Sequence, residues 1–170
     1  MSTSAVTTLF PSYNTNFLDE LKYSDELENS DVSDVSGDSV SMPQSYLIPK
    51  LHENGHENFN NETSDAQLLF VEDLPAPFWI HRNYLEPQST FFKDKFEEYI
   101  PGKPMEIKVP SPENFEPLLE YLYTGDGDKW YDSMNLDNYY EVWTNVNFLG
   151  LGHEANAICM AFYQNVVLEN

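Results

Sequence analysis

One short stretch of this sequence has the residue types and spacing of a catalytic motif. His52-Glu53-Asn54-Gly55-His56 is a literal H-E-x-x-H, which on a helix places two histidines on one face to bind zinc and offers the glutamate as general base. Asn54 and Gly55 disfavour a helix inside the motif, and no third ligand is evident. A zinc hydrolase that uses His52, Glu53 and His56 is therefore only our third hypothesis.

Two other side chains could react. His81 could exchange protons near neutral pH, but no serine or cysteine nucleophile has a motif partner, and a structural histidine at a strand-to-helix corner explains it better. Cys159 falls on the apolar face of a predicted helix, where a buried structural thiol is the default. We therefore predict that the protein is not an enzyme and uses no cofactor and no metal.

The composition excludes other classes of function. The chain has 170 residues and a net charge of −21, with 29 acidic residues against 8 basic ones. Without a run of Lys or Arg, such a surface repels phosphate backbones, so we expect no direct nucleic-acid binding. The first residues lack a secretory pattern, and no window approaches the roughly 20 apolar residues of a membrane helix. With a single cysteine, this predicts an intracellular protein of the cytoplasm or nucleus, with no membrane partner.

The chain divides into two parts of different character. Residues 1–63 are rich in Ser, Asn and acidic residues, and we expect them to form a disordered acidic tail. Small apolar groups such as Phe17, Leu18 and Leu21 leave open a docking peptide that folds on a partner. Residues 64–170 carry the apolar periodicity of a folded domain.

Within residues 64–170 the periodicity predicts strands and helices in an α+β arrangement, a small sheet covered by helical hairpins. Pro75 and Pro77 place the second strand at an edge of the sheet. Ser89 and Ser111 are expected to cap the helices that follow them, with Pro112 in the first turn. The predicted order is strand 66–71, strand 76–80, a helical turn at 81–86, helix 90–99, strand 105–109, helix 112–124, a polar loop 126–135, and two last helices over 139–149 and 155–166.

Five landmarks in order resemble one known family. They are Asp65 at the first strand, Phe78-x-x-His81-Arg82, Ser89-Thr90-Phe91-Phe92, the run Phe115 to Gly125, which reads F-x-x-L-L-x-Y-L-Y-T-G, and Leu149-Gly150. Over about Asp65 to Val167 the chain resembles the BTB/POZ family. The resemblance implies the BTB fold and a role as an adaptor or oligomerisation module. The partner it implies is either a cullin scaffold of a ubiquitin ligase or a transcriptional co-regulator.

The resemblance also bears on how partners are held. Cullin adaptors of the family carry an apolar-x-Glu motif after the helix that contains Phe96; here Ile100 takes the apolar position and Gly102 stands in place of the Glu. Family dimers often use a helix before the first strand, where this chain has His52 to Asn61, a segment of low helix propensity. A homodimer and a monomeric adaptor both stay open.

Seven residues are our candidates for protein binding. The resemblance implies a charged pocket formed by Asp65 and Arg82, for which a plain ion pair is the alternative. Trp130 and Tyr131, two large aromatic residues in the predicted polar loop, either pack beneath it or contact a partner. The full set of candidates is Asp65, Arg82, Phe96, Ile100, Tyr123, Trp130 and Tyr131.

Overall fold

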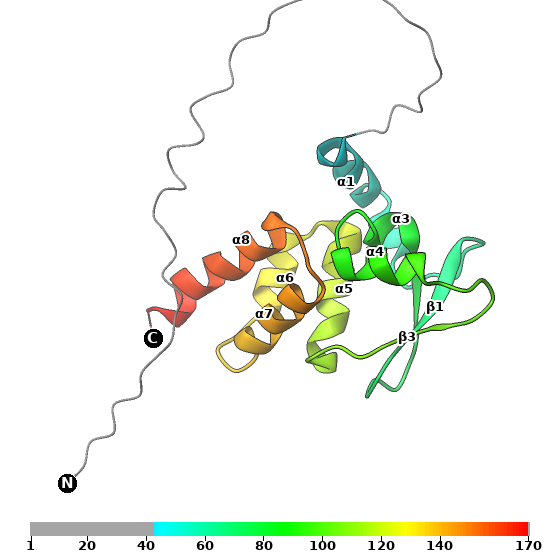
Figure 1. Ribbon diagram of the computed structural model, residues 1–170. Coiled ribbons are helices and arrows are strands. Elements are labelled where there is room, and N and C mark those ends of the chain that lie inside the picture. The colour runs from blue at the N-terminus through cyan, green and yellow to red at the C-terminus, as the bar shows by residue number, and fades with distance from the viewer. Residues whose placement is uncertain (1–42, 170) are drawn as a thin grey trace, which may run out of the picture. The chain divides into compact units, whose positions relative to one another are not determined.

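The computed structural model describes residues 43–169, a small sheet with helices around it (Figure 1). In chain order its elements are α1 (Gln44–His52), α2 (Gly55–Asn58), β1 (Ala66–Val71), β2 (Phe78–His81), α3 (Arg82–Leu85), α4 (Thr90–Glu97), β3 (Met105–Ile107), the 3-10 turn η2 (Pro112–Asn114), α5 (Phe115–Thr124), α6 (Gly127–Ser133), α7 (Tyr139–Phe148), α8 (His153–Phe162) and the π-helical turn η3 (Tyr163–Val167). The predicted α+β class is confirmed.

The sheet has three strands in the order β2-β1-β3. β1 pairs antiparallel with β2 and parallel with β3. Leu69 and Ile107 are buried on the face that meets the helices, whereas Phe70 and its partner Glu106 are exposed on the other face. β2 lies at an edge of the sheet, as the prolines predicted, and Pro75 and Pro77 both fall before its first residue, Phe78.

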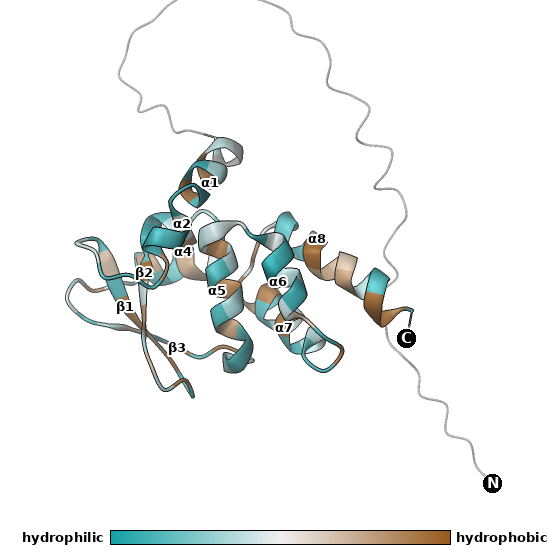
Figure 2. Cartoon of the chain, turned by 180° about the vertical axis from the view of Figure 1, so that it is seen from behind, coloured by the Kyte–Doolittle hydropathy of each residue, from teal (hydrophilic) through white to brown (hydrophobic). Residues whose placement is uncertain are grey.

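α5 is the central helix of the domain. Its residues Phe115, Leu118 and Leu119 are fully buried, and Gly125 ends the helix with φ of 68°. In both ribbon views the sheet lies to one side of α5, and α6, α7 and α8 lie to the other (Figures 1 and 2). α8 buries Ala155, Cys159 and Phe162, which recur at helical spacing, the pattern of a helix with one buried face.

The entry to α5 differs from the prediction. Ser111 does not cap the backbone; its Oγ instead accepts a 2.8 Å hydrogen bond from the side-chain amide of Asn114. The side-chain amide of Asn145 on α7 holds the backbone of Ser111. Its oxygen accepts the N–H of Ser111 (3.0 Å), and its nitrogen donates to the carbonyl of Ser111 (2.7 Å). Because Asn145 is fully buried, these bonds fix α7 to the start of α5.

Two helices precede β1, where a disordered segment was expected. α1 and α2 contact α5, and Gly55 approaches it so closely that a Cβ would lie 1.9 Å from the carbonyl oxygen of Tyr123. Asn58 donates to the hydroxyl of Tyr84 (3.1 Å), which donates to the carbonyl of Leu51 (3.0 Å). The boundary at residues 63/64 is therefore no structural break; residues 1–42, with Phe17, Leu18 and Leu21, lie outside the described residues.

The predicted polar loop at 126–135 is largely a helix, α6. Asp126 caps it by accepting the N–H of Lys129 (2.9 Å), a local signal that the composition of the segment conceals. Trp130 stacks on Tyr121 with ring centroids 4.6 Å apart, so α6 contributes to the core.

Among the described residues no helix is both long and apolar enough to cross a membrane.

Replacing Gly55 with alanine should destabilise the protein by about 1–3 kcal/mol, because the new methyl group would collide with rigid backbone. Gly152→Ala is the matched control, since a Cβ there meets nothing within 4 Å. Urea unfolding of the full chain measures both. Equal stability of the two variants would show that α2 does not pack on α5 as described.

Candidate functional site

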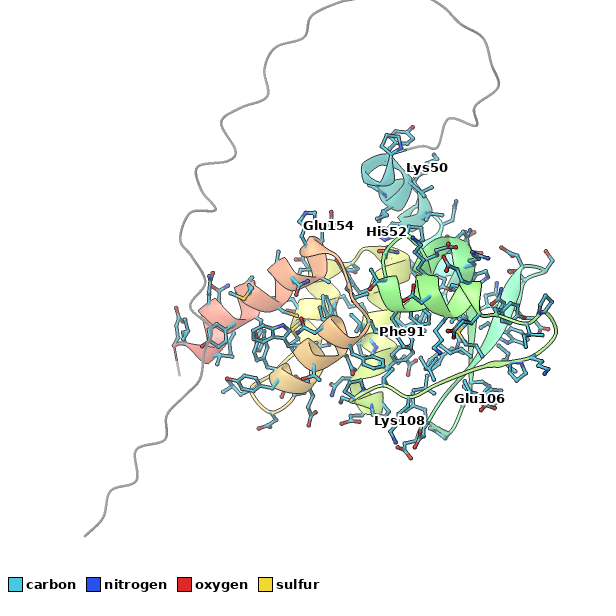
Figure 3. All side chains as sticks on the ribbon, in the orientation of Figure 1. Lys50, His52, Phe91, Glu106, Lys108 and Glu154 are labelled. Atoms are coloured by element: carbon cyan, nitrogen blue, oxygen red, sulfur yellow. The ribbon has the colours of Figure 1, made fainter. Side chains whose placement is uncertain are left out.

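An exposed apolar strip crosses from α4 to α7. Phe91 of α4, labelled in Figure 3, packs against Phe148 of α7 with ring centroids 4.9 Å apart. Phe148 is 41% exposed, and the Nζ of Lys95 lies 5.9 Å from the centroid of Phe91. An apolar contact of this kind on a surface is typical of a place where another protein binds.

The turn after α4 extends this strip. Ile100 is 56% exposed there and borders a hollow of about 170 Å³ together with Lys95 and Met105. The N–H of Lys103 donates to the carbonyl of Ile100 (3.1 Å), and Gly102 has φ of 84°. A glutamate at position 102 would be strained in this backbone conformation, so the turn presents an apolar side chain without the neighbouring carboxylate.

The exposed side of α7 completes the strip. Tyr140, Thr144 and Phe148 follow one another at four-residue spacing, and all three are exposed. Tyr139 and Val146 face the opposite way and are fully buried. We name the surface made by Phe91, Lys95, Ile100, Tyr140 and Phe148 the α4–α7 face.

A larger cleft than the hollow beside Ile100 lies elsewhere. It has a volume of about 400 Å³ and lies between α1, the α3–α4 turn, α5 and the start of α8. Its walls are mainly apolar, with Ile48 and Leu122 among them, and His52 and Glu154, both labelled in Figure 3, lie at its border. The Nε2 atom of His52 is wholly buried, so a molecule in this cleft could not reach it without a rearrangement.

The two histidines of the H-E-x-x-H sequence belong to different elements. His52 ends α1 and packs over Gly125, whereas His56 is exposed on α2. Within residues 43–169 no group of three His, Cys, Asp or Glu side chains is arranged to hold a metal ion. The motif is thus split by the turn at Glu53 and Asn54, and it does not form the single helix that the zinc hypothesis requires.

The predicted pair of Asp65 and Arg82 does not form. Arg82 instead forms an ion pair with Glu86, one helical turn ahead on the same segment, and Asp65 accepts a 2.7 Å hydrogen bond from the hydroxyl of Thr63. That hydrogen bond lowers the pKa of Asp65. Arg82 pairs with Glu86 and not with Asp65 because a partner four residues away in a helical turn is reached at little entropic cost. That Asp65 and Arg82 contact a partner protein stays a prediction.

Three of the other candidates are core residues. Phe96 is 3% exposed, Trp130 2% and Tyr123 0%, so none of them can anchor a partner on the surface. Tyr131 is half-buried against Phe162, with ring centroids 5.3 Å apart. Of the seven candidates, only Ile100 both lies in the α4–α7 face and is largely exposed.

Tyr123 belongs to a chain of hydrogen bonds around His81 that runs from the exposed Asp65 into the core. Thr63 donates to the carboxylate of Asp65, so its hydroxyl accepts the Nε2–H of His81 (2.8 Å). The Nδ1 atom of His81 is then unprotonated and accepts the O–H of Tyr123 (2.9 Å), which itself accepts the backbone N–H of His81 (2.8 Å). His81 is thus a neutral structural residue at the strand-to-helix corner, as expected.

The single cysteine is also structural. Cys159 is 1% exposed on α8, and burial raises the pKa of its thiol to about 12. A thiol that stays protonated at neutral pH is a poor nucleophile. This agrees with the prediction of a buried thiol on an apolar helix face.

Residues 54–148 match the family model described as the BTB/POZ domain. The BTB domain of zebrafish PATZ1 is a similar solved structure, with a TM-score of 0.54 and 20% sequence identity over 75% of this chain and 98% of that chain. No curated protein matches. The likeness to PATZ1 concerns the fold alone.

The buried His81 should make stability depend on pH. Burial lowers the pKa of His81 below 6.5, and the nearby Asp65 carboxylate opposes this only in part. As the pH falls, the unfolded chain therefore binds a proton at His81 at a higher pH than the folded chain does. The free energy of unfolding is constant above about pH 6.5 as far as His81 is concerned. It decreases as the pH drops from there toward the lower pKa of the folded state.

Urea unfolding of the wild type, His81→Gln and His153→Gln at pH 7.5 and 5.5 tests this. The free energy of unfolding should decrease less between pH 7.5 and pH 5.5 in His81→Gln than in the wild type. In His153→Gln, which changes an exposed position, it should decrease as much as in the wild type. The same loss in all three proteins would contradict the assignment of a neutral, buried His81.

Proposed function

The chain belongs to the BTB/POZ family, whose model matches more than half of it, and on that premise we propose that it is an adaptor that docks on a scaffold of the cullin type through the α4–α7 face. The family itself is one of protein-interaction and oligomerisation modules.

The observation that carries the proposal is the exposure of Ile100 beside other apolar side chains. Ile100 occupies the apolar position of the family's docking motif, is 56% exposed, and shares a hollow with Lys95, which lies over Phe91. A partner that covered this strip would bury several apolar groups at once, the usual centre of a stable interface.

Gly102 stands where cullin adaptors of the family have the glutamate of their apolar-x-Glu motif, so this docking lacks that carboxylate. With no carboxylate at position 102, the adaptor has no charged contact there, and the apolar contacts of Ile100, Phe91 and Phe148 supply the affinity. At this turn, the contact depends more on shape and less on salt than one with a charge pair would.

Replacing Ile100 with aspartate should weaken binding to an immobilised cullin N-terminal domain by at least about tenfold. The variant loses the apolar side chain at the centre of the interface and buries a carboxylate in its place. Surface plasmon resonance with the full-length chain measures this. Leu168→Asp is the matched control, since Leu168 is similarly exposed at 63% but lies beyond α8. The proposal fails if the wild type does not bind, or if the Ile100 variant binds as well as the control.

A further inference from the structure

The α7 end of the α4–α7 face lies in a part of the chain without cationic side chains. From Trp130 to Asn170 the sequence holds no Lys or Arg, but it has five acidic residues. Lys129, just before this stretch, is already paired with Glu120 at 2.6 Å. The negative charge around α7 is therefore not neutralised by Lys or Arg from this part of the chain.

Two carboxylates flank an exposed aromatic residue in sequence at the start of α7. Tyr140 is 60% exposed; Asp137, in the turn three residues before it, and Glu141, the residue after it, are both exposed. Glu141 uses one oxygen to accept a 3.1 Å hydrogen bond from Asn114, which limits its motion.

The turn that carries Asp137 is held in place. The side chain of Asn135 accepts the backbone N–H of Asp137 (2.9 Å), and that of Asn138 accepts the N–H of Asn135 (2.8 Å). The acidic groups and the ring are thus presented by a fixed backbone, so little ordering entropy opposes binding.

We propose that this end of the face receives a cationic, amphipathic segment of a partner protein, with a Lys or Arg over the ring of Tyr140 between Asp137 and Glu141. The segment's apolar side chains then lie along α7 toward Phe148 and Phe91. The inference rests on the proposed docking role of the face, and it adds the chemistry of the partner.

Two physical effects favour this partner over a neutral or acidic one. A cation over an exposed aromatic ring is attracted by the negative face of the ring, which strengthens binding a few-fold. At physiological salt the screening length is about 8 Å, so carboxylates close to the bound cation attract it and distant charges of the chain matter little. Acidic segments would meet repulsion from both groups, and no Lys or Arg of α7 could offset it.

The test uses two synthetic 14-residue peptides with the same leucines at helical spacing, one with lysines and one with glutamates at the polar positions. Binding to the full-length chain is measured by fluorescence anisotropy at 150 mM salt. The lysine peptide should bind and the glutamate peptide should not. Equal binding of the two peptides would overturn the inference.

Site variants separate the proposed contact from general attraction to a chain of charge −21. Tyr140→Ala should weaken lysine-peptide binding about fivefold, the size of a cation–π contact. Tyr46→Ala, at a tyrosine 62% exposed on α1, should change it less than twofold. If both tyrosine variants behave alike, the attraction is nonspecific and the inference fails.

A charge-matched pair completes the design. The double variant Asp137→Asn with Glu141→Gln should lose binding at least as strongly as Tyr140→Ala, and it keeps an oxygen to accept the bond from Asn114. Glu57→Gln with Glu62→Gln removes the same charge elsewhere and should bind like the wild type.

The two proposals can fail separately. Cullin binding that persists while the peptides show no site dependence overturns only the cationic partner. Site-dependent peptide binding without cullin binding overturns only the identity of the scaffold.

Discussion

The hydroxyl group of Tyr123 joins the parts of the domain that meet at the end of α5. It accepts the backbone N–H of His81 and donates to the ring of the same residue, while its own ring stacks on Tyr84 at 4.4 Å. The carbonyl of Tyr123 lies against Gly55. A buried hydroxyl is costly to leave unpaired, so the bonds to His81 hold β2 to α5. The close approach of Gly55 to the carbonyl adds α2 to the same unit.

That unit determines where the docking face can lie. α3 contacts both α4 and α5, and Asn145 fixes α7 to the start of α5, so α4 and α7 are both anchored on the same central helix. With their inner faces buried, Ile100, Tyr140 and Phe148 are left exposed, and Phe91 is left half-buried beside Phe148. The face is thus a consequence of the core, since the helical period that buries Tyr139 and Val146 exposes Tyr140 and Phe148.

The sequence predicted the elements whose apolar period is strong and missed those formed by tertiary contacts. β1, α4 and α5 follow clear patterns, whereas α1 and α2 depend on the fit of Gly55 against Tyr123 and on the side-chain bond of Asn58. Composition does not reveal such contacts. For the site, Ile100 could be found from the motif, but burial of Trp130 and Phe96 depends on which helical face turns inward.

The central claim is that a partner binds across α4 and α7. Hydrogen–deuterium exchange of the full-length chain, with and without saturating cullin N-terminal domain, tests it most directly. The account predicts slower exchange in peptides that cover residues 90–103 and 139–148, with no change in β1 or β2. Protection confined to α1 and α2, or to the exposed side of the sheet around Phe70, would contradict it.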